Sequence, residues 1–94
     1  MIVWTEQAVR QIDQAHDYIA LNNSEDIATS VVLRIVTHIE QLVAFPMSGR
    51  PGSVAGAREL VIAKTPFIAA YAIDKARIVV LAVYHGAQRW PETF

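Results

Sequence analysis

The chain of 94 residues is long enough for one domain with a hydrophobic core and too short for a second module, so the sequence predicts a single domain over residues 1–94. Hydrophobic residues make up 53% of the chain and charged residues 18%, which excludes an intrinsically disordered protein. The chain contains no cysteine, which also excludes disulfides, zinc sites built on thiolates and a cysteine nucleophile. No apolar run approaches the ~20 residues that cross a bilayer, and we expect a small cytoplasmic domain with no membrane partner.

The net charge of −1 conceals an uneven distribution along the chain. Residues 1–45 carry two basic and six acidic side chains, a net charge of −4, whereas residues 46–94 carry six basic and three acidic ones, a net charge of +3. Such an asymmetry is one sign of a surface that faces a polyanion. It is equally compatible with ordinary surface scatter, because a strongly basic nucleic-acid binder would carry more positive charge.

The first half of the chain predicts a strand followed by a helical hairpin. Met1–Trp4 is a short apolar segment, and Thr5 is a good cap for a first helix. Asn22 and Asn23 interrupt the helical pattern, and Ser24 can cap a second helix that ends at Phe45-Pro46. The residues at helical spacing are Ala8, Val9, Ile12, Ala15, His16 and Ile19 in the first helix, and Ala28, Val31, Val32, Ile35, Ile39, Leu42 and Val43 in the second.

The second half predicts a sheet, which gives an α+β fold with the element order β-α-α-β-β-β. The segment Met47–Gly52 is rich in proline and glycine and predicts a loop. Three predicted strands follow, at Arg58–Ala63, Phe67–Ile73 and Arg77–Tyr84. The helical hairpin should cover one face of the sheet. Because the strands are almost continuously apolar, we expect a partner chain to cover the other face.

Familiar catalytic motifs are absent from the sequence. It contains no GxxxxGK, GxGxxG, HExxH or GxSxG pattern. His16 and His38 lie within the predicted helices, where packing or a surface role is the simpler interpretation. The sequence therefore predicts neither a cofactor nor a metal site.

The segment from His85 to Pro91 is the first candidate for chemistry. His85 directly follows the last predicted strand, and Arg89 lies four residues later. A histidine can exchange protons near neutral pH, and an arginine can hold a phosphate. The alternative is structural: His85 closes a strand end, while Trp90 and Pro91 pack the tail.

A second group of candidates surrounds the proline- and glycine-rich turns. Rigid turns would present Arg50 and Arg58 with little conformational freedom, which suits anion contacts. The alternative is a tight connection in which Arg58 pairs with Glu59 or with an acidic helix residue. Tyr71 lies in the middle of a predicted strand, where it could stack on a base or pack in the core.

Four segments together resemble the RelE/ParE toxin superfamily. They are Gly49-Arg50-Pro51-Gly52, Arg58-Glu59-Leu60-Val61, Thr65-Pro66-Phe67-Ile68 leading to Tyr71, and His85-Gly86-Ala87-Gln88-Arg89-Trp90-Pro91. The resemblance extends over essentially the whole chain. It implies a compact α+β fold with a mainly antiparallel sheet. It also implies the toxin of a bacterial type II toxin–antitoxin module, of the plasmid stabilisation or addiction kind. Such a toxin arrests growth and is neutralised by an antitoxin encoded next to it.

Members of the superfamily act on one of two targets. RelE-like members cut mRNA in the ribosome, and this metal-independent cleavage is the function that we predict here. His85 and Glu59 would supply the acid and base, with Arg58 and Arg89 on the scissile phosphate. ParE-like members instead inhibit DNA gyrase without catalysis, which is the alternative. The predicted target contacts are Arg50, Lys64, Tyr71, Gln88 and Trp90.

Two features of the sequence depart from the RelE-like pattern. Those ribonucleases usually carry a basic residue just before the strand tyrosine, where this chain has Phe67-Ile68-Ala69-Ala70. They are also strongly basic, whereas this chain has a pI near 6.3.

Overall fold

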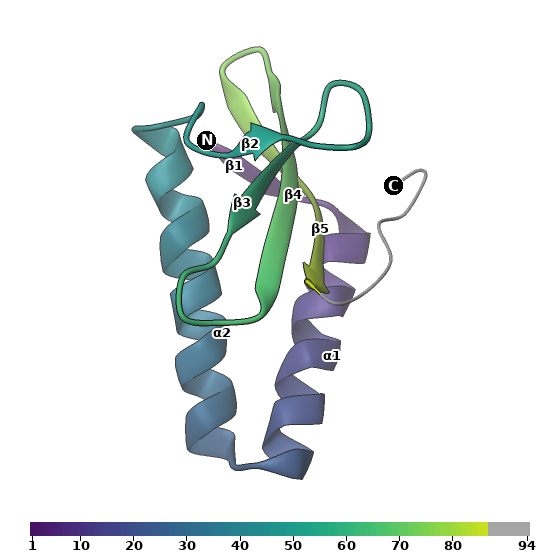
Figure 1. Ribbon diagram of the computed structural model, residues 1–94, viewed down its shortest axis with the longest axis vertical. Coiled ribbons are helices and arrows are strands. Elements are labelled where there is room, and N and C mark those ends of the chain that lie inside the picture. Colours follow the sequence, from purple (N-terminus) through teal and green to yellow (C-terminus); the bar gives the residue numbers. More distant parts are fainter. Residues whose placement is uncertain (87–94) are drawn as a thin grey trace.

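The computed structural model describes residues 1–86, which form a five-stranded sheet and a helical hairpin (Figure 1). The elements in chain order are β1 (Ile2–Trp4), α1 (Glu6–Asn22), α2 (Glu25–Glu40), the 3₁₀ turn η1 (Gln41–Val43), β2 (Arg50–Pro51), β3 (Arg58–Val61), β4 (Phe67–Asp74) and β5 (Arg77–His85). The predicted α+β order of a strand, two helices and an antiparallel sheet is confirmed.

Two details of that prediction are wrong. Four strands follow the hairpin instead of three, because β2 forms inside the segment that was predicted as a loop. Arg50 pairs with Glu59 and Pro51 pairs with Arg58, and β2 forms the edge of the sheet. A proline is tolerated there because no further strand requires a hydrogen bond from its backbone nitrogen. The second helix ends at Glu40 and tightens into η1 before it reaches Phe45.

Hydroxyl side chains begin both helices, as the sequence predicts. The Thr5 hydroxyl accepts a hydrogen bond from the backbone N–H of Ala8 at 3.1 Å, and Ser24 Oγ accepts one from Ile27 at 3.1 Å. Thr5 also donates to the carbonyl of Leu81 at 3.1 Å. The first cap therefore ties the start of α1 to β5.

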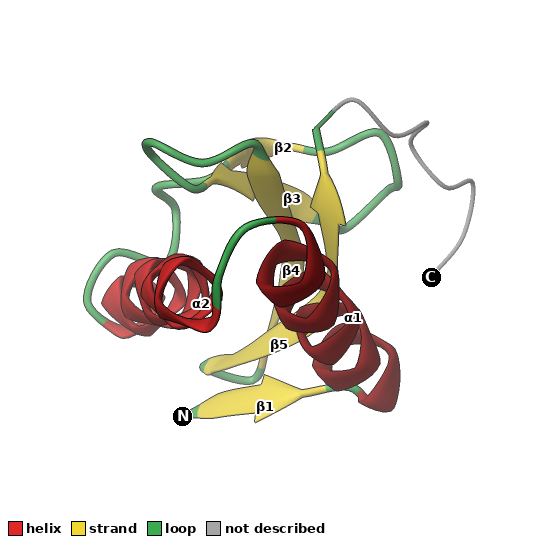
Figure 2. Ribbon diagram, turned by 90° about the horizontal axis from the view of Figure 1, so that it is seen from below, coloured by secondary structure: helices red, strands yellow, loops and turns green. Residues whose placement is uncertain are grey.

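The strands lie in the order β1-β5-β4-β3-β2, which can be followed across Figure 2. β1 runs parallel to β5, and the remaining pairs are antiparallel. The pairing of β4 with β5 steps from Ala70↔Ala82 to Tyr71↔Val80, so Leu81 is an extra residue that forms a bulge. The bulge allows both Val80 and Val83 to join the main core.

The main core lies between the helical hairpin and one face of the sheet. Its largest fully buried side chains are Tyr71, Ile35, Ile39, Leu42, Ile62 and Val80. The predicted helical stripes thus supply Ile35 and Ile39 from α2, together with Ala8 from α1. Among residues 1–86, no helix is long and apolar enough to cross a membrane.

The opposite face of the sheet, here called the open face, carries a smaller cluster. Ala70, Ala82 and Tyr84 are buried there, with Ile68 and Leu81 packed against them. Val61, the cross-strand neighbour of Ile68, is half exposed. Short alanines and one tyrosine therefore account for much of this face. Ile68 and Leu81 are only partly buried, and the expectation that a partner chain covers this face stays a prediction.

A tight turn joins β4 to β5. Asp74 pairs with Arg77, which leaves Lys75 and Ala76 as the two turn residues, with φ values of 51° and 65°. A two-residue hairpin of the I′ type requires positive φ at both positions, where Asn and Gly are the usual residues. The turn lies in the gap between the two strands predicted at Phe67–Ile73 and Arg77–Tyr84.

Candidate functional site

Consecutive residues of β3 point to opposite faces of the sheet, and this separates two of the predicted catalytic residues. Arg58 pairs with Tyr71, a member of the main core, whereas Glu59 pairs with Ala70 of the open face. Side chains that are directly opposite on neighbouring strands share a face. Arg58 therefore lies on the helix side and Glu59 on the open side.

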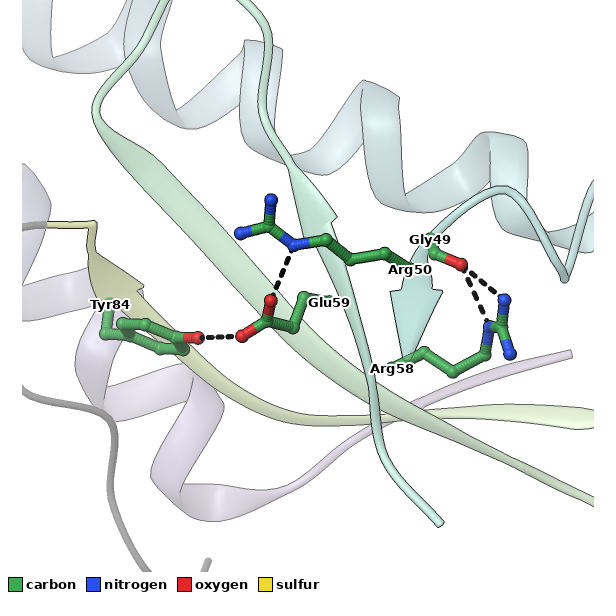
Figure 3. Close-up of polar contacts among 5 residues, drawn as sticks. All are labelled: Gly49, Arg50, Arg58, Glu59 and Tyr84. Atoms are coloured by element: carbon green, nitrogen blue, oxygen red, sulfur yellow. Dashed lines mark hydrogen bonds and ion pairs between the residues drawn. The ribbon is translucent and has the colours of Figure 1, made fainter. Parts of the chain in front are cut away.

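The guanidinium of Arg58 is engaged by backbone carbonyls. Its Nε donates to the carbonyl of Gly49 at 3.0 Å, and Nη2 donates to the same oxygen at 2.5 Å (Figure 3). Nη2 also donates to the carbonyl of Met47 at 3.3 Å. Gly49 is itself buried. A guanidinium engaged in this way holds a loop, which favours a structural role for Arg58 over a phosphate contact. Its partners are backbone carbonyls, however, and not Glu59 or an acidic helix residue as the structural alternative expected.

Tyr71 completes the attachment of the same loop. Its hydroxyl donates to the carbonyl of Pro46 at 2.7 Å and accepts from the N–H of Gly49 at 3.0 Å. We call the attachment of Pro46–Gly49 by Tyr71 and Arg58 the Gly49 junction. Tyr71 is fully buried within the chain, which does not favour its predicted role as a direct target contact.

The junction explains why residue 49 is a glycine. A Cβ built there would lie 2.6 Å from the Tyr71 hydroxyl and 2.7 Å from the carbonyl oxygen of Glu59. Both distances are far shorter than van der Waals contact. The loop can approach β3 and β4 this closely only without a side chain.

On the open face, Arg50, Glu59 and Tyr84 form a polar group that we call the Glu59 cluster (Figure 3). Arg50 Nε donates to Glu59 Oε1 at 2.6 Å, and the Tyr84 hydroxyl donates to Glu59 Oε2 at 3.2 Å. The side chain of Glu59 is 12% exposed, whereas that of Arg50 is 60% exposed. The carboxylate is thus covered by two donors, while the guanidinium reaches into solvent.

The environment of Tyr84 keeps its phenol protonated. Burial raises the pKa of Tyr84 well above its usual value, and the neighbouring Glu59 carboxylate raises this pKa further. The tyrosine is therefore a lasting hydrogen-bond donor to Glu59. From the sequence, Tyr84 could stack on a base or pack in the sheet. Its contact with Glu59 was missed, although its position beside His85 at the strand end was available as a signal.

His85 lies on the other side of the sheet from Glu59. It pairs with Phe67, whose ring it meets edge-on at 5.8 Å between centroids. The two residues border a cleft of about 420 Å³ between α1 and β5. The cleft is lined by Gln11, Gln14, Ala15, Tyr18, Phe67, Val83, Tyr84 and His85. Gln11, which the sequence did not single out, caps the edge of β5 by accepting from the Val83 N–H at 2.7 Å.

The structure does not bring Arg58 and His85 together. Arg58 pairs with Tyr71 and His85 with Phe67, two positions on β4 that are about 13 Å apart at about 3.3 Å per residue. The convergence was expected from the strand arrangement that the resemblance implies, whereas the register decides it. Within residues 1–86, the predicted catalytic side chains do not form a single site.

The remaining predicted residues fall into two groups. Lys64 is exposed in the turn between β3 and β4, at a φ of 64°. Gln88, Arg89 and Trp90 lie outside the described residues. Among the described residues, no three His, Asp or Glu side chains gather as metal ligands would.

Comparison with known proteins identifies the family. A sequence model of the family described as "ParE toxin of type II toxin-antitoxin system, parDE" matches residues 2–90. The chain belongs to the ParE toxin family.

Two relatives agree with this assignment. "Putative toxin Y4kP" of Sinorhizobium fredii (strain NBRC 101917 / NGR234) is 41% identical over 91 residues, which cover 97% of this chain and 93% of the relative. A solved structure entitled "Chromosomal ParDE TA system from P. aeruginosa" superposes with a TM-score of 0.82 at 28% identity, over 89% of this chain and 92% of that one. The resemblance to RelE/ParE toxins is thereby confirmed, and membership of a toxin–antitoxin family supports an antitoxin partner.

Proposed function

We propose that this ParE-family toxin arrests growth by binding and inhibiting DNA gyrase without catalysis. The observation that carries the proposal is the distribution of the predicted acid–base groups over both faces of the sheet. Glu59 lies on the open face beside Arg50, whereas His85 lies beside Phe67 on the helix side. A ribonuclease needs its proton acceptor, proton donor and cationic clamp around one phosphate.

Two further features support the proposal. Arg58, the predicted phosphate clamp, has its guanidinium on the carbonyls of the Gly49 junction. The chain as a whole carries a net charge of −1, which is unfavourable for contact with ribosomal RNA. A protein–protein target needs neither a free clamp nor a basic surface.

The test compares the two targets with the same preparation of toxin. Full-length toxin, separated from its antitoxin and refolded, is added to gyrase with relaxed plasmid, and separately to translating ribosomes with mRNA. We expect a loss of supercoiling and intact mRNA, with activity of gyrase restored by the antitoxin. Cleaved mRNA together with unaffected supercoiling would refute the proposal.

Metal-independent RNA cleavage remains a second candidate because of the Glu59 cluster. A carboxylate that can accept a proton and an arginine that can bind a phosphate lie together here, with the Tyr84 phenol as a hydrogen-bond donor. If this candidate holds, Glu59→Gln removes the base and should abolish mRNA cleavage with little change in melting temperature. Glu59→Gln that still arrests growth would exclude the cluster as a nuclease site.

A further inference from the structure

The terminal nitrogens of Arg50 are presented to solvent in a fixed orientation. Glu59 binds the Nε–H at 2.6 Å, and Figure 3 shows both terminal nitrogens directed away from that carboxylate. Within residues 1–86, these nitrogens make no hydrogen bond. The backbone of Arg50 is held as well, because the residue belongs to β2 and pairs with Glu59. A long side chain that normally loses much conformational freedom on binding is thus oriented beforehand.

The orientation depends on a short chain of contacts that begins in the sheet. Tyr84 is buried and donates to Oε2 of Glu59, so the carboxylate is held from one side while its Oε1 binds Arg50. Glu59 is only 12% exposed and has little room to move. The rigid part of the cluster is therefore Tyr84 and Glu59, and the exposed part is Arg50.

We infer that Arg50 is an anchor for a carboxylate on the protein target, and that Glu59 and Tyr84 are the positioning residues that orient its guanidinium. The inference rests on the proposed function, because it takes gyrase as the target. The planar fork of a guanidinium matches the two oxygens of a carboxylate. Preorganisation lowers the entropic cost of that contact.

A protein carboxylate fits this surface better than a nucleic acid does. The open-face group Arg50, Glu59, Val61 and Tyr84 carries no net charge, whereas binding to a phosphate backbone draws on several cations together. The surface also fits a transient target better than a permanent partner. Ala70, Ala82 and Tyr84 of this face are already buried within the chain and Ile68 and Leu81 are partly buried, whereas permanent interfaces are usually large and apolar.

The experiment is a double-mutant cycle on the full-length toxin. Arg50→Ala should weaken gyrase inhibition about 10- to 100-fold, the scale of a lost charged hydrogen bond. Tyr84→Phe and Glu59→Ala should each weaken it several-fold, but should have no further effect when they are combined with Arg50→Ala. Arg50→Lys keeps the positive charge but lacks the planar guanidinium, so it should weaken inhibition almost as much as Arg50→Ala does. If Arg50→Ala folds poorly, the cycle can be repeated with Arg50→Lys.

A matched control is available in Arg77→Ala. Arg77 pairs with Asp74 at 2.8 Å and its side chain is 44% exposed, yet it lies in the β4–β5 hairpin and not in the Glu59 cluster. This variant should inhibit like the wild type. All variants are also scored for growth arrest, for antitoxin affinity and for binding to a labelled single-stranded RNA.

The outcomes separate this inference from the proposed function. Wild-type toxin that arrests growth without inhibiting gyrase would refute the proposed target, and the same cycle read on growth arrest would still test the anchor. The inference is overturned by wild-type potency of both Arg50 variants, or by additive effects of Glu59→Ala and Arg50→Ala. It is also overturned if Arg50→Ala reduces only antitoxin or RNA binding.

Discussion

Removal of one hydroxyl from the core should destabilise the toxin strongly. Tyr71→Phe keeps the buried ring but deletes the hydroxyl of the Gly49 junction. The buried Gly49 N–H then lacks an acceptor, which costs about 1–3 kcal/mol, and the bond to Pro46 is lost, which adds about 0.5–1.5 kcal/mol. We expect a loss of about 2–4 kcal/mol, a large part of the ~5–15 kcal/mol that stabilises a domain.

The effect is measured by thermal unfolding of the refolded toxin, followed by circular dichroism. For a domain of this size, about 4–8 °C of melting temperature is lost per kcal/mol, so the midpoint should fall by at least about 8 °C. Tyr18→Phe is the matched control, because Tyr18 is 70% exposed and should change stability by less than about 0.5 kcal/mol. A Tyr71→Phe midpoint equal to that of the control would refute the role of the hydroxyl in the junction.

Three more expectations follow from buried groups. Gly49→Ala should cost about 1–3 kcal/mol in urea unfolding, because its Cβ would overlap the Tyr71 hydroxyl; an unchanged midpoint would mean that the loop can withdraw. Ile35→Ala should cost roughly 2–5 kcal/mol, since Ile35 is fully buried, whereas Leu33→Ala on the exposed side of α2 should cost little. The pKa of Tyr84 is raised in the folded protein, so the environment of its neutral phenol contributes its full stability below pH 10.0, the ordinary pKa of tyrosine. Above that pH the contribution is lost progressively, because Tyr84 ionises in the unfolded chain before it does in the folded one. The wild type should therefore lose more stability above that pH than Tyr84→Phe does, and parallel pH profiles would argue against the shift.

Local sequence signals were sufficient for most of the fold. Thr5 and Ser24 mark helix starts by chemistry that acts within three residues, and the stripe through Ile35 and Ile39 follows directly from helical spacing. β2 was missed because a two-residue strand has no periodicity to detect. Arg50 and Pro51 become a strand only through pairing with β3, which is a property of the tertiary structure.

The candidate site could be predicted only as a set of residues. Arg50, Arg58 and Glu59 were all identified as polar groups near a glycine-rich turn, but their partners depend on register. Arg58 and Glu59 are adjacent in sequence and point to opposite faces, and the bulge at Leu81 determines which residues of β5 accompany them. Sequence alone cannot locate such a bulge, because Val80, Leu81 and Ala82 read as one apolar run.

Arg58 and Arg50 differ in how many of their side-chain nitrogens are engaged within the chain. The carbonyl of Gly49 accepts hydrogen bonds from both Nε and Nη2 of Arg58. Arg50 is the next residue after Gly49, and it meets a carboxylate that takes only its Nε. Because the loop lies so close to β3 and β4, Arg58 holds the loop in place. The same approach fixes the backbone of Arg50, whose side chain extends into solvent. If an arginine of β2 or β3 contacts a partner, these bonds favour Arg50, because recruiting Arg58 would first break the bonds that hold the loop in place.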